Sequence, residues 1–338
     1  MRAATASTVP FLPWPLATFV GLATTSPPAV PNSPTPEPTV TTSLKTHLSI
    51  VVSAGLWKVV FAAAVLAWAS PLDKSSALSL DGGWALRIAA RNLLLTWFVG
   101  GLWDFLHLSS YSPLYARLQP LKFTPAPVRA GQVPHDALWA SCSALVSAAI
   151  EVAIWHAWAR GTLPLAEAPN WWAHGPTLAW LLALPHLQIV HFWAVHRVMH
   201  RWFPRERKGP TAWLPDVGAW LYTHVHSLHH LSRDPTAFSG ISMHPVESAL
   251  FFTTMPLFAL CGAHPVVILH ASFYNIVQAM VGHESFEGPS TGGHFHWLHH
   301  QLIDCNFGGP FVPLDALLGT AVSSEEEFQK RIRGKSED

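Results

Sequence analysis

Apolar residues along the chain gather into long continuous stretches. Four of these stretches lie at 47–69, 89–109, 137–158 and 176–196. Each is long enough to cross a bilayer as an α-helix, which needs about 20 residues. A fifth, at 248–281, is about twice as long as one such span, and CGAHP at 261–265 interrupts it. The pattern predicts four transmembrane helices and a re-entrant helical hairpin that returns to the side from which it entered.

Composition supports a membrane protein. Hydrophobic residues make up 50% of the 338 residues and charged residues only 12%, whereas about a quarter of the residues of a soluble domain are charged. The formal net charge of zero gives no reason to expect a nucleic-acid partner. Cys142, Cys261 and Cys305 are too few and too scattered for a disulfide framework or a cysteine-based zinc site, so we expect inert thiols.

Charges between and within the stretches refine the topology. Lys and Arg exceed acids in the loops 110–134 and 197–208, which predicts that these loops and both termini face the cytosol. Lys58, Asp104 and Glu151 interrupt the apolar stretches, and for Lys58 and Glu151 we expect contacts between helices.

The resulting prediction is an all-α integral membrane protein with a cytosolic, histidine-rich helical cap. Residues 1–45 are Pro-rich and expected to be disordered, although FLPWPLATFVGLA leaves a targeting segment open. Residues 46–196 form the transmembrane stem, residues 197–320 form the cap with its hairpin at 248–281, and residues 321–338 form a charged C-terminal tail.

Fifteen of the 21 histidines lie between His191 and His300, and they form a pattern. HRVMH places His196 and His200 at i and i+4 on one helical face. HVHSLHH and HFHWLHH then repeat the motif HxHxLHH. In a helix, HxxHH puts its three imidazoles on a shared face, so each triad is expected to point at one spot.

The two triads and the first pair supply eight imidazoles, and the returning hairpin would bring His283 to the same side. A zinc site closes at four ligands, so this number of imidazoles indicates two metal ions. Imidazole binds zinc, copper, iron and nickel alike, and the residues alone do not identify the metal.

Carboxylates commonly orient metal-binding histidines through hydrogen bonds. The nearby candidates are Glu247, Glu284, Glu287 and Asp304. Structural roles are expected for the remaining histidines outside the motifs: His47, His107, His135, His156, His174, His186, His191, His264 and His270, and surface or supporting roles for His224 and His294. Aromatic residues near the motifs are expected to be anchors at the membrane interface: Trp193, Trp202, Trp213, Trp220 and Trp297.

HRVMH, HSLHH, HPVE at 244–247, GHESF, HWLHH, NFGG at 306–309 and PLDALLGT at 313–320 occur in this order. Over about 135–321 the chain resembles the fatty acid hydroxylase and sterol desaturase superfamily, whose members are endoplasmic-reticulum membrane enzymes with a four-helix stem, a cytosolic histidine-rich cap and a di-iron centre that uses O2. The resemblance implies nine metal ligands that are also the catalytic groups: His196, His200, His226, His229, His230, His283, His296, His299 and His300. It places Asn306 near them and makes His244 a candidate further ligand or orienting group.

The chain departs from the family pattern at three points. It has no acidic residue between Glu167 and Glu206, and it has Ile303 and Phe307 where aromatic and Tyr residues are common. It also lacks the HPGG loop of a fused cytochrome b5 domain. The resemblance therefore implies a separate electron donor, such as cytochrome b5 and its reductase.

The implied function is O2-dependent desaturation or hydroxylation of a lipid C–H bond by two iron ions. A sterol is the favoured substrate because the haem domain is missing, with a C5-desaturase-like or C4-methyl-oxidase-like reaction. A fatty-acyl or sphingolipid hydroxylase of the same superfamily is the alternative, and a non-catalytic metal-binding or metal-transport protein is a more distant one. An intramembrane zinc protease is disfavoured because the chain contains no HExxH motif.

Overall fold

The computed structural model describes residues 73–80, 82–167, 170–203, 213–286, 293–309 and 312–330. These residues form helices joined by turns, with one isolated β-bridge between Lys122 and Phe286 and no strand among them. The predicted first span at 47–69 with Lys58, the Pro-rich segment 1–45 and the end of the C-terminal tail lie outside the described residues.

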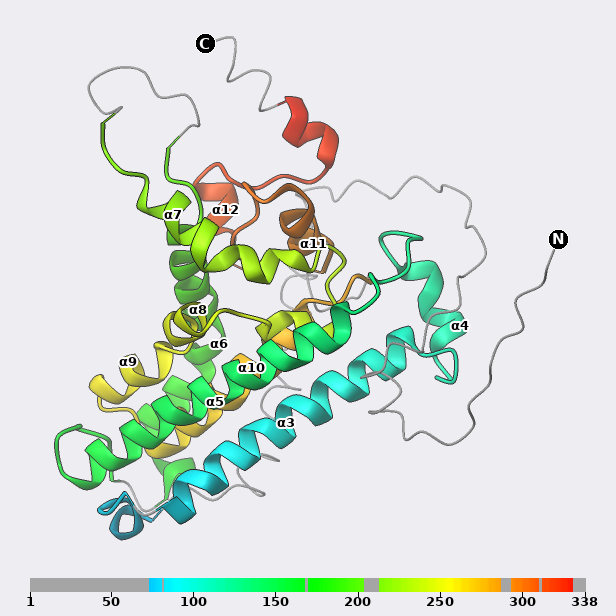
Figure 1. Cartoon of the computed structure of the whole chain (residues 1–338). Helices are drawn as coiled ribbons and strands as arrows, with labels where there is room; N and C mark the ends of the chain where they lie inside the picture. The colour runs from blue at the N-terminus through cyan, green and yellow to red at the C-terminus, as the bar shows by residue number, and fades with distance from the viewer. Residues whose placement is uncertain are drawn as a thin grey trace.

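Two long helices lie side by side in opposite directions: α3 (Gly82–Leu108) and α5 (Gln132–Ala159) (Figure 1). Arg91 of α3 donates a hydrogen bond through Nη2 to Oε2 of the fully buried Glu151 of α5, at 2.5 Å. Glu151 also accepts a hydrogen bond from Trp155 Nε1 at 3.0 Å. The prediction that Glu151 makes a contact between helices is therefore confirmed.

Three described helices are long and apolar enough to cross a membrane. α5 and α6 (Gly175–Val198) coincide with two predicted spans, and α10 (Pro265–Gly282) is the return arm of the predicted hairpin. α3, which covers the stretch predicted as the second span, is not among the three; it carries Arg87, Arg91 and Asp104. The chain is a largely helical membrane protein, while four spans and a cytosolic cap stay predictions.

The predicted hairpin has a divided first arm. That arm consists of α8 (Pro245–Phe251) and α9 (Thr254–Leu260), and the chain then turns through Gly262, whose φ of 72° favours glycine. His264 caps α10 by accepting a hydrogen bond from the Val266 amide at 3.2 Å. The break predicted at CGAHP is thus confirmed. Most of α10 is buried, so this helix forms the centre of the core.

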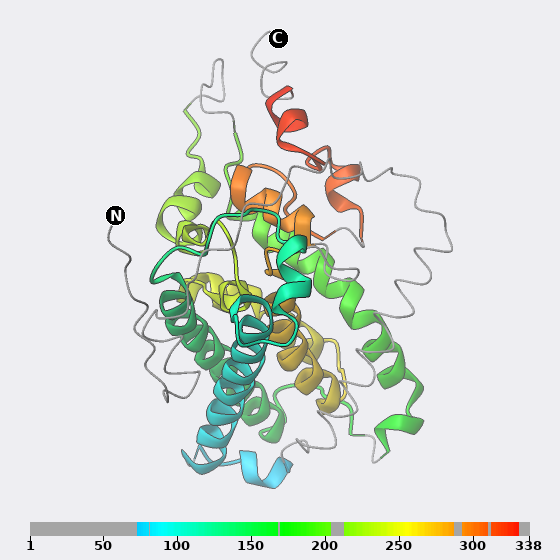
Figure 2. The same ribbon diagram turned by 90° about the vertical axis from the view of Figure 1, so that its right-hand side faces the viewer.

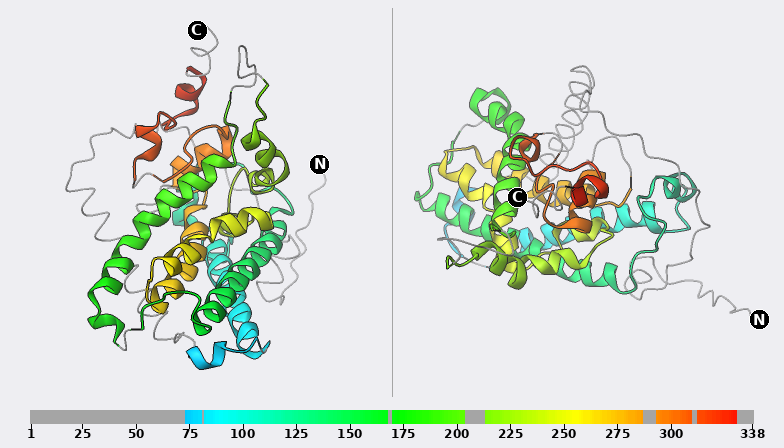
Figure 3. Two further views of the ribbon diagram at one scale, coloured as in Figure 1. Left: turned by 90° about the vertical axis from the view of Figure 1, so that its left-hand side faces the viewer. Right: turned by 90° about the horizontal axis from the view of Figure 1, so that it is seen from above.

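Short elements connect or flank the long helices. Near the stem these are η1 (Lys74–Ala77), α4 (Tyr115–Leu118), η2 (Gln119–Leu121) and η3 (Trp171–Ala173). A second set gathers at the end of the molecule where α6 finishes (Figures 1–3): α7 (Val217–His224), η4 (His226–Leu231), α11 (Gly293–Leu302) and α12 (Leu314–Leu317). Below them, η5 (Ala237–Ile241) packs against α10, α5 and α3. The histidine motifs therefore meet at one end of the helical stem.

Candidate metal centre

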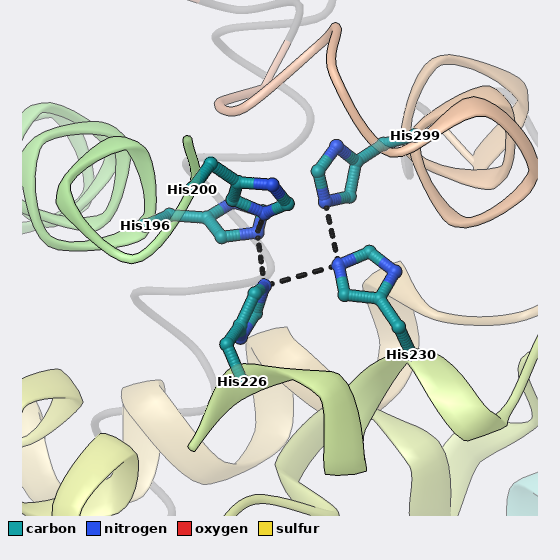
Figure 4. Close-up of side chains that lie close together, drawn as sticks. All are labelled: His196, His200, His226, His230 and His299. Carbon is teal, nitrogen blue, oxygen red and sulfur yellow. Dashed lines mark hydrogen bonds between the residues drawn. The ribbon is translucent and has the colours of Figure 1, made fainter. Parts of the chain in front are cut away.

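Nine buried histidines lie in two neighbouring groups. The first group contains His196, His200, His226, His230 and His299 (Figure 4), and the second contains His229, His283, His296 and His300. Within each group, one nitrogen from every residue lies within 4.8 Å of the others. The side chains come from the end of α6 and the residues just after it, from η4, from the end of α10 and from α11. The structure thus brings together all nine histidines singled out from the sequence.

Each HxxHH motif divides its histidines between the two groups, so the prediction that each triad points at one spot is wrong. His296 and His300 of α11 belong to the second group, and His299 belongs to the first. At 3.6 residues per turn, positions i and i+4 differ by about 40°, whereas i+3 lies about 60° away on the other side. The motif 226–230 divides in the same way, although its backbone is a 3₁₀-helix and not the expected α-helix.

Hydrogen bonds fix the proton on the outer nitrogen of several of these rings. Nδ1 donates to a backbone carbonyl oxygen in three of them, from His196 to Phe307 at 2.6 Å, from His299 to Cys305 at 2.6 Å and from His283 to Ala279 at 2.7 Å. In a fourth, His226 Nδ1 donates to Glu247 Oε1 at 2.7 Å. Because a backbone carbonyl oxygen only accepts, the rings of His196, His299 and His283 keep an unprotonated Nε2 directed into the group, and the ionised form of Glu247 does the same for His226.

The inward nitrogens therefore face one another as lone pairs. His196 Nε2 lies 3.0 Å from His226 Nε2 (Figure 4); His196 carries its proton on Nδ1, and so does His226 when Glu247 is ionised. In the second group His283 Nε2 lies 3.2 Å from His229 Nε2, and His229 Nδ1 donates to the Ser242 carbonyl at 3.4 Å. Lone pairs at such distances repel unless a cation lies between them, so the donor set fits metal ions.

The spacing of the nitrogens also fits a particular coordination. Two nitrogens bound at about 2.1 Å to one ion lie about 3.0 Å apart when their bonds are at right angles and about 3.4 Å apart in a tetrahedron. Contacts between inward nitrogens measure 2.8 Å for His283 and His296, 3.0 Å for His226 and His230 and 3.1 Å for His230 and His299. The right-angled spacing is typical of ions with five or six ligands, which fits the five donors of the first group; the second group supplies four donors, the number that a tetrahedral site uses.

Burial keeps the imidazoles neutral. It lowers the pKa of His229 to about 4 and that of His283 to about 3. Burial, with like-charged neighbours as the smaller cause, lowers the pKa of other members well below 6.5: His200, His226, His230, His296, His299 and His300. Neutral imidazole is the form that binds metal, so these residues can bind ions at neutral pH without first losing a proton.

The predicted orienting carboxylates fall in different places. Glu247 contacts His226 directly. Glu284 instead accepts a hydrogen bond from Trp103 Nε1 and lies 3.1 Å from His107 Nε2. Asp304 is exposed, and Glu287 lies outside the described residues.

Two buried carboxylates near the centre were not identified from the sequence. Asp315, within the PLDALLGT motif, accepts hydrogen bonds from the Phe307 and Gly308 amides at 2.9 and 2.8 Å, and so fixes the loop whose carbonyl contacts His196. Asp136 at the start of α5 accepts from the hydroxyl groups of three serines. The sequence signal for Asp136 was a single acidic residue directly before the apolar stretch 137–158.

Other candidates lie outside both groups. His244 caps α8 by accepting from the Val246 amide at 3.2 Å, and we do not include it among the proposed ligands. Asn306 is buried with a φ of 53°; it donates to the Phe295 and Val322 carbonyls and so joins α11 to the C-terminal segment.

The remaining predicted roles are also visible. His191 contacts the Thr253 hydroxyl at 2.8 Å, His224 is exposed, and His294 stacks on Trp297. Among the described residues, none of these three histidines belongs to either histidine group. Trp202 is 42% exposed, Trp213 78% and Trp220 58%. Trp193 packs against Gly308. It therefore supports the loop next to the histidine groups, in addition to the membrane-interface role predicted for it.

Comparison with known proteins agrees with these motifs. Residues 180–320, which include all nine histidines, match the model of the fatty acid hydroxylase family. A very-long-chain aldehyde decarbonylase of Oryza sativa subsp. indica is 26% identical over 174 residues, which are 48% of this chain and 56% of that protein. Methylsterol monooxygenase 2-2 of Arabidopsis thaliana is 26% identical over 144 residues, 39% of this chain and 47% of that protein. Cholesterol 25-hydroxylase of Homo sapiens is 32% identical over 114 residues, 30% of this chain and 42% of that protein.

The family match falls on the part of the chain that carries the nine histidines. The chain spans about half the length of the curated relatives it matches. No solved structure matches it. The family match and the named relatives confirm the resemblance inferred from the motifs: residues 180–320 match the fatty acid hydroxylase domain, and the named relatives belong to the same superfamily.

Proposed function

We propose that this protein is a membrane-bound di-iron enzyme that uses O2 to oxidise a C–H bond of a lipid. The observation that carries the proposal is the pair of buried histidine groups whose unprotonated nitrogens face one another. Nine inward nitrogens exceed the needs of one ion, and two adjacent ions suit a reaction in which O2 takes up several electrons.

Iron is proposed because of the family, since imidazole also binds zinc, copper and nickel. Iron bound at the two groups would supply the redox chemistry with O2. The chain contributes the rest: the nine imidazoles would hold the ions, and Glu247 and the Phe307, Cys305 and Ala279 carbonyls orient four of the rings. Burial of all nine side chains keeps bulk water away from the reacting atoms.

A separate electron donor follows from the balance of the reaction. Inserting one atom of O2 into a C–H bond and releasing the other as water consumes two electrons and two protons beyond those of the substrate. Desaturation with release of two waters has the same requirement. We propose a separate carrier, such as cytochrome b5 with its reductase, and placement in the endoplasmic reticulum membrane with the histidine groups facing the cytosol.

A sterol is the proposed substrate, with desaturation or methyl oxidation as the reaction. Relatives named methylsterol monooxygenase and cholesterol 25-hydroxylase support this choice. Relatives named very-long-chain aldehyde decarbonylase favour a long-chain lipid as the second candidate, alongside the fatty-acyl and sphingolipid hydroxylation already considered. A lipid whose body stays in the bilayer can reach the centre because α6, which carries His196, is itself apolar enough to span the membrane.

The experiment is to purify the full chain in detergent and identify and count its bound metal. We expect about two iron ions per chain from the two nitrogen groups. The same preparation, given an electron donor and O2, is then incubated separately with a sterol mixture and with long-chain acyl lipids and aldehydes, and the products are identified by mass spectrometry.

Each result decides between named alternatives. A single zinc ion, or no metal, would contradict the di-iron proposal. Two iron ions without oxidation of any lipid in the presence of the electron donor would favour the non-catalytic metal-binding protein. Oxidation of acyl lipids but not sterols would overturn the sterol assignment alone.

A further inference from the structure

Asp136 is a buried carboxylate with no part in the metal chemistry proposed above. It lies in the first turns of α5, and its side chain has no exposed surface. Its ion-pair partner is the half-buried His135, at 3.1 Å, and Asp104 is a second acidic residue in its surroundings. An ionised group in such a place is costly unless hydrogen bonds compensate for the lost water.

Three serine hydroxyls supply those hydrogen bonds. Ser232 Oγ lies 2.8 Å and 2.7 Å from the two carboxylate oxygens, Ser239 Oγ donates at 2.6 Å and Ser242 Oγ donates at 3.0 Å. All four residues are fully buried. Hydrogen bonds to a carboxylate are about twice as strong as those between neutral groups, so Asp136 holds the segment 232–242 firmly against α5.

Two of these serines also contact His229, a member of the second histidine group. The Ser242 carbonyl accepts the Nδ1 proton of His229 at 3.4 Å, and the Ser232 amide donates to the His229 carbonyl at 3.4 Å. The ring and the backbone of His229 therefore both rest on residues that Asp136 holds. The segment contains the 3₁₀-helix η5, and Asp136 joins the residues on its two sides, Ser232 and Ser242.

We infer that Asp136 is a positioning residue that sets His229 for metal binding in the second histidine group. The inference rests on the proposed function, because it concerns the ion that this group would hold. Asp136 acts through Ser232 and Ser242 and does not touch the ion or the substrate. Asp104, Gln132 and Ser285 also hold the middle of the segment, at Ala237, Asp234 and Pro235. Removing Asp136 therefore loosens chiefly Ser232 and Ser242, and with them the orientation of the His229 ring, while the first group keeps its own supports at Phe307, Glu247 and Cys305.

The test compares Asp136→Ala with Ser143→Ala in the full chain in detergent, titrated anaerobically with Fe²⁺. Ser143 lies in the same helix and forms a buried hydrogen bond with Ser248 at 2.6 Å, so it controls for loss of any buried contact of α5. Loss of a group that supports a metal ligand weakens metal affinity by about 10- to 100-fold. Because Asp136 acts through an intervening residue, we expect the second ion to bind about 10-fold more weakly in Asp136→Ala, with the first ion unaffected. Ser143→Ala should bind both ions as the unaltered chain does.

Assignment of the weakened site uses Co²⁺ as an optical probe. The spectrum of Asp136→Ala with one equivalent of Co²⁺ should match that of His300→Ala, which lacks a donor of the second group, and differ from that of His200→Ala, which lacks a donor of the first. Asp136→Asn keeps an oxygen that accepts hydrogen bonds and should restore part of the lost affinity.

Unchanged affinity for both ions in Asp136→Ala, or equal weakening of both, would overturn the inference. If Asp136→Ala does not fold, Ser242→Ala removes one of the hydroxyl contacts and should weaken the same ion, and an unchanged second ion in that variant would likewise overturn it. Failure of the unaltered chain to bind two ions would instead contradict the proposed function.

Discussion

Glu247 Oε1 accepts a hydrogen bond from His226 Nδ1 at 2.7 Å, and both side chains are buried. His226 belongs to the first histidine group, where its Nε2 lies 3.0 Å from Nε2 of both His196 and His230. The carboxylate thus holds the proton on the outer nitrogen and leaves the inner one free to bind metal. Burial raises the pKa of Glu247 well above its usual value. A bound cation would favour the ionised carboxylate, and that charge should in turn strengthen the binding of the cation.

We therefore expect Glu247→Ala to weaken binding of the ion in the first group by about 10- to 100-fold. Glu247→Gln should lose less, because its amide oxygen can still accept the His226 proton. Anaerobic Fe²⁺ titration of the purified chain measures both. Asp304→Asn serves as the control because Asp304, another acid near the motifs, is exposed. Equal affinities for Glu247→Ala and Asp304→Asn would contradict the role of Glu247.

His300 offers a direct test of the second group. Its ring is buried, and neither of its nitrogens has a hydrogen-bond partner in the described structure. Substitution by alanine therefore breaks no protein hydrogen bond, and its main effect should be on metal binding. We expect the iron content of His300→Ala to fall from about two ions to about one per chain. The exposed His224→Ala should keep both ions, and an unaltered iron content in His300→Ala would exclude His300 as a ligand.

Acidification should destabilise the metal-free protein. Burial lowers the pKa of His229 from 6.5 to about 4. Between these two values the unfolded chain binds more protons than the folded one, so stability is retained above the unfolded pKa and falls as the pH decreases toward the folded pKa. Over that window His229 alone accounts for on the order of 3 kcal/mol. Thermal unfolding in detergent after metal removal, at pH 7 and pH 5, measures the fall, and a substitution such as His229→Asn should reduce it. Equal unfolding temperatures at both pH values would contradict the neutral state of the ring.

Much of the architecture follows from the apolar pattern. Long apolar stretches became α5 and α6, and the interruption at CGAHP became the turn before α10, because glycine takes the positive φ there and proline begins the next helix. The convergence of the nine histidines was also predicted, because motif spacing places the imidazoles of each motif on neighbouring faces of a helix and the hairpin returns His283 to the same side.

The division of each motif between two groups was not predictable from spacing alone. It depends on where the backbones of α6, α10 and α11 meet, and His226–His230 adopts a 3₁₀-helix that no local signal indicated. The supports of the centre were hidden for the same reason. Asp136 is 96 residues from Ser232, and their contact exists only in the folded chain. The resemblance made His244 a candidate further ligand or orienting group, and its cap on α8 through Nδ1 is a contact that the motif did not indicate.

The loop after α11 provides the most local test of the centre, because two adjacent glycines differ sharply in their surroundings. A Cβ atom on Gly308 would lie 2.9 Å from Trp193 Cδ1 and 3.1 Å from Asp315 Oδ2, whereas one on Gly309 would meet nothing within 4 Å. The Gly308 amide also donates to Asp315, in the loop whose Phe307 carbonyl accepts the His196 proton.

Gly308→Ala should therefore displace this loop and the ring of His196 with it. Overpacking of this kind costs about 1–3 kcal/mol, which thermal unfolding of the metal-free chain would register as a lower midpoint. Iron titration of the same variant should show weaker binding in the first group, because the Phe307 carbonyl no longer fixes the proton on His196 Nδ1. Gly309→Ala is the matched control and should change neither quantity. If the two variants unfold at the same temperature and bind iron equally well, the loop does not support His196.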